Sequence, residues 1–179
     1  MALCEPDRYF SRISMINIQK DIIDVGFTHV LLDIDNTILR RDNHEVPRDV
    51  SFWLAQARSA GLEFCLVSNN WHEGVYELAT RLDLPIVAKA VKPMPPAFMI
   101  ALRKIGAKRK STVMIGDQLI TDVLGAHFVG MKAYMLQPLV EQDLKHTLLL
   151  RNLERVFMGD REPESAVIDY AGEEPDQQG

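Results

Sequence analysis

Two carboxylate residues, Asp33 and Asp35, stand at the end of an apolar run that begins at Val30. A run of this length that stops at ionised groups predicts a buried parallel strand whose carboxyl end opens into a polar site, because charges are not left in a core without partners. Residues two apart in an extended chain lie on the same side, so the two carboxylates repel each other. A divalent cation or a shared proton relieves that repulsion, and we expect a metal site here.

Polar groups also stand where three further expected strands end. These groups are Ser68-Asn69-Asn70, Lys92-Pro93, and Gly116-Asp117 with Asp122 five residues on. They suit phosphoryl transfer, because a carboxylate can be the nucleophile, a hydroxyl and an ammonium can hold phosphate oxygens, and further carboxylates can hold magnesium.

Strand-like and helix-like segments alternate along the chain. Helical periodicity fills the gaps between strands and also covers an N-terminal stretch, and the expected strands lie near residues 28–34, 63–67, 85–88, 112–115 and 132–136. Such alternation predicts an α/β fold, a three-layer αβα sandwich around a parallel five-stranded Rossmann-like sheet. In these sheets the site lies at the carboxyl ends of the strands.

The composition is that of one cytoplasmic domain. The chain has 179 residues and a hydrophobic share of 47%, as expected for one globular domain. Its formal net charge of -5 argues against nucleic acid as a partner. We see neither a secretory signal nor an apolar segment long enough to span a bilayer. We divide the chain into an N-terminal helical segment packing on the core (1–27), a catalytic domain (28–157) and an acidic, mobile tail (158–179).

Four short motifs, in order, resemble those of the haloacid dehalogenase (HAD) superfamily of phosphatases. They are Asp33-Ile34-Asp35-Asn36-Thr37, Val67-Ser68-Asn69-Asn70, Lys92-Pro93 and Gly116-Asp117-Gln118-Leu119-Ile120-Thr121-Asp122. The residues of the first and fourth motifs are similar to those of subfamily IIIA and of its YqeG-like branch, which is related to phosphatidylglycerophosphate phosphatases. The resemblance covers roughly residues 10 to 157. Neither interval that holds a cap domain in other members has room for one, so the resemblance implies an open, capless site.

The resemblance implies a covalent mechanism that depends on Mg²⁺. Asp33 is expected to attack phosphorus and form an aspartyl-phosphate, while Asp35 protonates the leaving oxygen and later activates water. The metal is expected to be held by the Asp33 carboxylate, the Asp35 backbone carbonyl and Asp117.

The same resemblance assigns the residues around the transferring phosphoryl group. Ser68, Asn69 and Lys92 are expected to bind its oxygens. Asp122 and Thr37 are expected to orient the metal site from behind its ligands.

Each motif taken alone also has an ordinary structural explanation. Asp33 and Asp35 could end a strand in a turn, and Ser68 could cap a helix. Lys89 competes with Lys92 for the third motif, although the proline after Lys92 fits a residue held extended at the rim of a site. The presence of four motifs in order favours the catalytic interpretation.

We therefore expect a phosphomonoester phosphatase, with phosphatidylglycerophosphate as the leading substrate. Small sugar phosphates or nucleotides are the alternative substrates, and a non-hydrolytic phosphoacceptor or scaffold protein is the alternative class. A phospholipid head group or another copy of the chain could shield the open site. A late apolar stripe at Leu149, Leu153 and Val156, flanked by basic residues, could contact a membrane surface. His72 either contacts substrate or is an exposed loop histidine.

Overall fold

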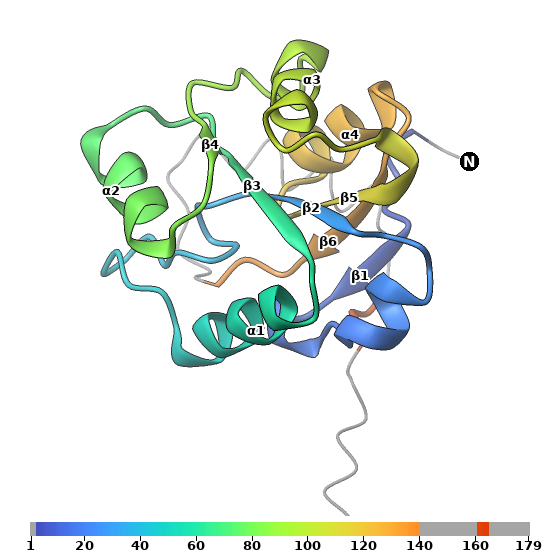
Figure 1. Ribbon diagram of the computed structural model, residues 1–179, viewed down its shortest axis with the longest axis horizontal. Coiled ribbons are helices and arrows are strands. Elements are labelled where there is room, and N and C mark those ends of the chain that lie inside the picture. The colour runs from blue at the N-terminus through green and yellow to red at the C-terminus, as the bar shows by residue number, and fades with distance from the viewer. Residues whose placement is uncertain (1–2, 140–160, 165–179) are drawn as a thin grey trace, which may run out of the picture.

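The computed structural model describes residues 3–139 and 161–164, which form a six-stranded parallel sheet with helices on both faces (Figure 1). The order of the strands across the sheet is β1-β6-β5-β2-β3-β4, and every pair of neighbours is parallel. The strands are β1 (Arg8–Phe10), β2 (His29–Leu32), β3 (Glu63–Val67), β4 (Ile86–Val87), β5 (Thr112–Gly116) and β6 (Lys132–Leu136).

The sheet confirms the expected fold class and corrects its strand count from five to six. The additional strand, β1, pairs with β6, with Arg8 opposite Tyr134 and Phe10 opposite Leu136. It comes from the N-terminal segment, which we expected to be helical; the segment also contains the short helices η1 (Ile13–Met15) and η2 (Ile18–Ile23), so it is helical in part. A strand of three residues is too short to show a periodic pattern, and its pairing depends on residues more than 100 positions away.

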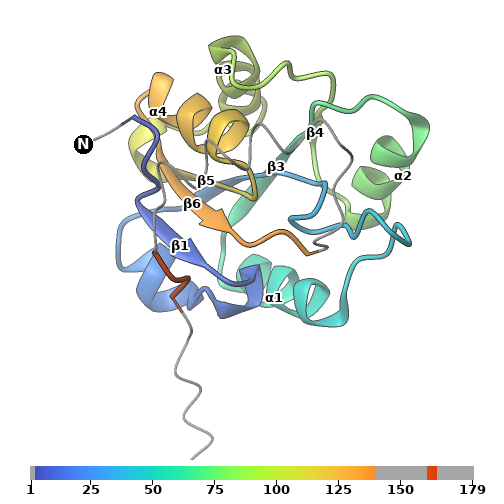
Figure 2. The same ribbon diagram turned by 180° about the vertical axis from the view of Figure 1, so that it is seen from behind.

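Alternate residues of the strands supply the two halves of the core. Val30 and Leu32 of β2 belong to one apolar cluster and Leu31 belongs to the other. The first cluster lies under η1, η2, α1 (Arg48–Ser59) and α2 (Glu73–Leu82). The second lies under α3 (Pro95–Lys104), η4 (Leu119–Leu124) and α4 (Gly125–Phe128), while η3 (Arg109–Ser111) precedes β5. Figure 1 and Figure 2 show α1 on one side of the sheet and α3 and α4 on the other.

Helix α1 shows how the sequence pattern produces one of these layers. Its buried residues are Val50, Trp53, Leu54 and Ala57, which follow the i, i+3, i+4, i+7 spacing of a helix face. The Trp53 indole N–H donates to the backbone oxygen of Ile16 at 2.8 Å, so the buried ring keeps a hydrogen-bond partner. This bond ties α1 to the N-terminal segment.

The intervals between the strands contain no inserted domain within the part of the chain described. A loop and α1 separate β2 from β3, and α2 alone separates β3 from β4. None of the helices in the described ranges is long and apolar enough to cross a membrane. The apolar stripe of residues 149–156 and nearly all of the tail at 158–179 lie outside the described residues.

Candidate active site

The carboxyl ends of three adjacent strands bring the candidate site residues together. Asp33 directly follows β2, Ser68 directly follows β3, and Asp117 directly follows β5. Because β2 lies between β5 and β3, these residues meet at one edge of the sheet. A pocket of about 180 Å³ opens there, lined by Asp33, Asp35, Arg41, Asn69, Asn70, Lys92, Gln118 and Thr121.

Lys92 is the buried cation of the site. Its ammonium donates to Oδ1 of Asp33 at 2.5 Å and to Oδ1 of Asp122 at 2.7 Å. Burial acts to lower the pKa of Lys92, but the charges and hydrogen bonds of the two carboxylates outweigh it, and the pKa is raised. Lys92 therefore remains an ammonium ion beside Asp33.

Asn69 holds the backbone of Lys92 in place. Its Oδ1 accepts from the Lys92 N–H at 2.7 Å, and its Nδ2 donates to the Lys92 carbonyl at 3.2 Å. The Lys92–Pro93 peptide bond is cis. The amide of Asn69 thus links the end of β3 to the third motif, a contact that the sequence did not indicate; its role in binding phosphate stays a prediction.

Ser68 and Asn70 connect the second motif to Asp35. Oγ of the fully buried Ser68 accepts from the Asn70 N–H at 3.0 Å, which leaves the hydroxyl hydrogen able to donate elsewhere. The Asn70 side chain donates to Oδ2 of Asp35 at 2.7 Å. Asn70 therefore fixes the orientation of the Asp35 carboxyl.

The environment of Asp35 raises the pKa of its carboxyl above the usual value of an aspartate. Burial raises the pKa of Asp35 and the neighbouring charge of Asp33 raises it further, against smaller opposing contributions from Arg41, Asn70 and His72. A carboxyl with a raised pKa is able to donate a proton to an oxygen in the pocket.

Three buried carboxylates form the acidic part of the site. One oxygen from each of Asp33, Asp117 and Asp122 lies within 4.8 Å of the others. Oδ1 of Asp117 is buried and has no hydrogen-bond partner in the described ranges. The pKa of Asp117 is raised well above its usual value by burial and by the charges of Asp33 and Asp122. An orphaned buried oxygen beside two other carboxylates fits a hard cation such as Mg²⁺, whose ligands are oxygens at about 2.1 Å.

Asp122 differs from Asp117 in that both of its oxygens have donors. Oδ1 accepts from Lys92 and Oδ2 accepts from the Gln118 N–H at 3.1 Å. Burial raises the pKa of Asp122 to about 6, with the charge of Lys92 lowering it and that of Asp33 raising it. These contacts favour a part in positioning Lys92 rather than in binding metal directly.

Gly116 leaves the space that Asp122 occupies. A Cβ built on Gly116 would lie 2.3 Å from Oδ2 of Asp122 and 2.4 Å from its Cγ. On the other side of the site, the hydroxyl of Thr37 donates to Oδ2 of Asp33 at 3.2 Å. Thr37 thus contacts the carboxylate that it was expected to support.

Sequence reasoning did not assign four of the residues that line the pocket: Arg41, Asn70, Gln118 and Thr121. Asn70, Gln118 and Thr121 lie inside the quoted motifs, and those positions could have identified them as site residues. Nothing in the sequence distinguishes Arg41 from Arg40, which instead binds Asp42 through two hydrogen bonds.

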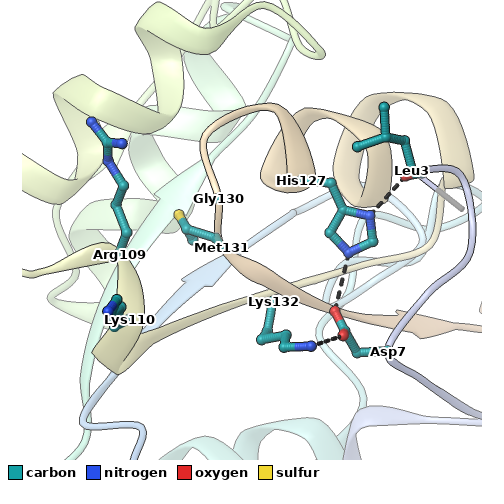
Figure 3. A pocket seen from close by; sticks show the side chains of 8 residues that line it. All are labelled: Leu3, Asp7, Arg109, Lys110, His127, Gly130, Met131 and Lys132. Carbon is teal, nitrogen blue, oxygen red and sulfur yellow. Dashed lines mark hydrogen bonds and ion pairs between the residues drawn. The ribbon is translucent and has the colours of Figure 1, made fainter. Parts of the chain in front are cut away.

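A larger cavity, of about 470 Å³, lies at the opposite edge of the sheet and contains none of the expected site residues. It adjoins η3 and the first residue of β6, at the amino ends of the strands. Figure 3 shows His127 and Lys132 both pointing at Asp7. Nε2 of His127 lies 3.0 Å from Oδ2 of Asp7, and Nζ of Lys132 lies 2.5 Å from its Oδ1. This cluster ties the N-terminal segment to β6.

The fold and the cluster at its edge define the class of protein. A family model described as HAD-hydrolase-like matches residues 90–138, which include the third and fourth motifs. A crystallised uncharacterised protein from Listeria monocytogenes serotype 4b has the same fold, with a TM-score of 0.53 over 66% of this chain and 85% of that one, at 20% identity.

A curated relative places the chain more closely. "Probable phosphatase YqeG" of Bacillus subtilis (strain 168) is 31% identical over 150 residues, which are 84% of this chain and 87% of the relative. The chain therefore belongs to the HAD superfamily of phosphatases, in the branch that contains YqeG. A shorter match, 37% identical over 65 residues, is to the phospholysine phosphohistidine inorganic pyrophosphate phosphatase of Xenopus laevis; it covers 36% of this chain and 24% of that protein.

Proposed function

We propose that this protein is a Mg²⁺-dependent phosphomonoester phosphatase that acts through an aspartyl-phosphate on Asp33, with phosphatidylglycerophosphate as the leading substrate. The observation that carries the proposal is the buried Lys92 ammonium between Asp33 and Asp122, beside Oδ1 of Asp117, which has no hydrogen-bond partner among the described residues. Such an arrangement supplies a carboxylate nucleophile, a fixed positive charge for phosphate oxygens and a ligand for a metal.

In the first half of the reaction, a carboxylate oxygen of Asp33 forms a bond to phosphorus while the bond to the leaving oxygen breaks. Asp35 transfers its proton to that oxygen, so the leaving group departs as a neutral alcohol. Lys92 and the hydroxyl of Ser68 donate to the phosphoryl oxygens. Asn70 keeps the Asp35 carboxyl directed at the pocket.

In the second half, water replaces the carboxylate of Asp33. Asp35, now ionised, takes a proton from the water as its oxygen attacks phosphorus, and the bond to Asp33 breaks. Inorganic phosphate leaves and Asp35 is again protonated. The raised pKa of Asp35 supports this alternation, because the group must give and take a proton in the same cycle.

Asp33, Asp117 and the backbone carbonyl of Asp35 are the proposed ligands of Mg²⁺, which supplies positive charge that offsets the repulsion between the phosphate dianion and the carboxylates. The orphaned oxygen of Asp117 supports this set, since the same group has a raised pKa and no donor of its own in the described chain. Asp122, whose two oxygens already accept hydrogen bonds, orients Lys92.

The choice of phosphatidylglycerophosphate rests on the resemblance of the four motifs to a branch related to phosphatidylglycerophosphate phosphatases, and the absence of an inserted cap in the described intervals supports it. An open pocket admits a substrate that is anchored in a lipid surface. Small sugar phosphates and nucleotides are the comparison substrates in the test.

The test measures phosphate release from phosphatidylglycerophosphate in micelles, sugar phosphates, nucleotides and an aryl phosphate, with Mg²⁺ and with chelator. Asp33→Asn should reduce turnover by a factor of about 10³ or more, since the nucleophile is lost. Asp42→Asn is the matched control, because Asp42 is an exposed carboxylate on the loop after the first motif. Turnover by Asp33→Asn at the rate of the wild-type protein would exclude the covalent mechanism.

The absence of turnover on every substrate would favour the phosphoacceptor or scaffold class. Intact-mass measurement after incubation with acetyl phosphate separates these two, since only the phosphoacceptor gains a stable phosphoryl group. Thermal unfolding gives a readout of the metal that is independent of activity: Mg²⁺ should raise the Tm of the wild-type protein more than that of Asp117→Asn.

A further inference from the structure

A cavity of about 510 Å³ lies between the loop that follows the first motif and helix α2, and it is not used by the chemistry described above. It is lined by Leu39, His44, His72, Gly74, Glu77, Leu78 and Arg81. Leu39 is bridged to Asp35 through the backbone, and the Asn36 N–H donates to the Leu39 oxygen at 2.8 Å. The cavity therefore begins on the side of the catalytic pocket where Asp35 lies.

The start of α2 is fixed to the same side. Asn70 donates to Oδ2 of Asp35 at 2.7 Å, and His72 follows two residues later as the residue that precedes α2. Helix α2 then carries Glu77, Leu78 and Arg81 along the cavity wall. The Asn70 hydrogen bond and the two residues that follow it therefore connect Asp35 to the helix that lines the cavity.

The mechanism determines which part of the substrate meets this cavity. In an in-line displacement the leaving oxygen lies opposite the nucleophile, and it must also reach the carboxyl that protonates it. With Asp33 as nucleophile and Asp35 as acid, the leaving group extends away from Asp33 and past Asp35. This cavity has a wall residue, Leu39, whose backbone is bridged to Asp35, so it adjoins the acid that the leaving group must reach.

The side chains in the cavity favour an anionic group. Arg81, His44 and His72 make no side-chain hydrogen bond or ion pair within the ranges that the structure describes, and Glu77 is the single acid in the lining. Arg41, which lines the catalytic pocket, also has no such partner there. A guanidinium with free donors binds phosphate in a fork, and imidazoles add further donors.

Apolar side chains complete the cavity. Leu39 and Leu78 are both buried and contribute to its wall. Carbon atoms that connect two polar groups in a substrate can pack against such side chains. The lining therefore fits a short carbon linker that ends in an anion.

We infer that this cavity binds the leaving group of the substrate, and that the leaving group carries a second phosphate that Arg81, His72 and His44 contact. This inference rests on the proposed function. The shared chemistry is a phosphomonoester joined by a short carbon linker to a second phosphate, as a monoester in a soluble bisphosphate or as the diester of a phospholipid head group.

The experiment compares kcat/KM for four substrates: an aryl phosphate, glycerol 3-phosphate, glycerol 1,3-bisphosphate and phosphatidylglycerophosphate in micelles. The wild-type protein should prefer the bisphosphate to glycerol 3-phosphate by about tenfold or more, as one charge-assisted hydrogen bond provides. Arg81→Gln should remove most of that preference through KM, and Arg81→Lys should restore part of it. Preference for the lipid over the soluble bisphosphate would identify the lipid as the source of the second phosphate.

Arg103→Gln is the matched control, since Arg103 is also an exposed arginine in the last turn of a helix but lies on α3, on the other face of the sheet. Equal kcat/KM for glycerol 3-phosphate and the bisphosphate would overturn the inference. So would a preference that Arg81→Gln leaves unchanged. The aryl phosphate distinguishes failure of this inference from failure of the proposed function. Hydrolysis of the aryl phosphate without a preference for the bisphosphate refutes this inference alone. No hydrolysis of any substrate refutes the proposed function as well.

Discussion

Replacing Gly116 by alanine tests how tightly the site is packed around Asp122. The added Cβ would lie 2.3 Å from Oδ2, 2.4 Å from Cγ and 2.7 Å from Cβ of Asp122. Since favourable contacts between carbon atoms lie at about 3.5 Å or more, Asp122 must move by about 1 Å. Its hydrogen bonds with Lys92 and the Gln118 N–H, now 2.7 and 3.1 Å long, would be lost or weakened.

The magnitude follows from two costs. Overpacking a dense region costs about 1–3 kcal/mol, and a hydrogen bond to a charged group is worth about 1.5–3 kcal/mol. Because the two costs overlap, we expect Gly116→Ala to lower the free energy of unfolding by about 3 kcal/mol, measured by urea denaturation. Phosphate release should fall as well, because Lys92 loses one of its two carboxylates.

A double-mutant cycle isolates the contact. Asp122→Gly removes the three atoms nearest to the added Cβ, so Gly116→Ala should cost less in that background, with a coupling of about 1–2 kcal/mol. Gly74→Ala is the control, since its Cβ would come no closer than 3.2 Å to an exposed imidazole, and alanine favours the helix by about 1 kcal/mol. Equal costs of Gly116→Ala in both backgrounds, within about 0.5 kcal/mol, would refute the reasoning.

Three further predictions concern parts of the fold away from the catalytic pocket. Burial acts to raise the pKa of Asp7, but hydrogen bonds from Lys132 and other donors outweigh it and lower the pKa. The stabilisation of the fold by ionised Asp7 should therefore be complete above about pH 5 and disappear as the pH falls below about 4. Unfolding curves of the wild-type protein and of Asp7→Asn should then converge in acid. Trp53→Phe should lower the free energy of unfolding by about 2 kcal/mol, since the buried oxygen of Ile16 loses its donor, and a change below about 0.5 kcal/mol in urea denaturation would contradict this. Burial raises the pKa of the Cys65 thiol to about 11, so Cys65 should react with a thiol reagent at pH 8 only after denaturant is added; labelling of the native protein at the rate of the denatured one would show that the thiol is accessible.

The sequence predicts those parts of the site that follow directly from strand ends. Asp33, Ser68 and Asp117 each come after an apolar run, and parallel strands bring their carboxyl ends to one edge. Lys92 follows a two-residue strand, β4, and its proline neighbour marked it as the third motif ahead of Lys89. The structure brings Lys92, not Lys89, into contact with Asp33.

The rest depends on contacts that no local pattern encodes. The pairing of β1 with β6 joins segments that are far apart in the chain, and three residues carry too little periodicity to predict it. The two hydrogen bonds between Asn69 and the backbone of Lys92 join residues 23 positions apart. Arg41 enters the pocket because of the course of a loop, which composition does not determine.

The charges of the buried carboxylates favour the binding of a divalent cation at this site. Asp33, Asp117 and Asp122 oppose one buried ammonium, Lys92, so the ionised cluster has two negative charges in excess. Burial and, after it, the neighbouring carboxylate charges raise the pKa of Asp117 and raise that of Asp122 to about 6, so the folded protein disfavours the fully ionised cluster. A divalent cation carries the two charges that are missing, and a phosphate dianion is attracted only once they are supplied. The same excess charge that disfavours the ionised cluster therefore favours binding of the metal, and metal and substrate should bind with positive coupling because each reduces the electrostatic cost of the other.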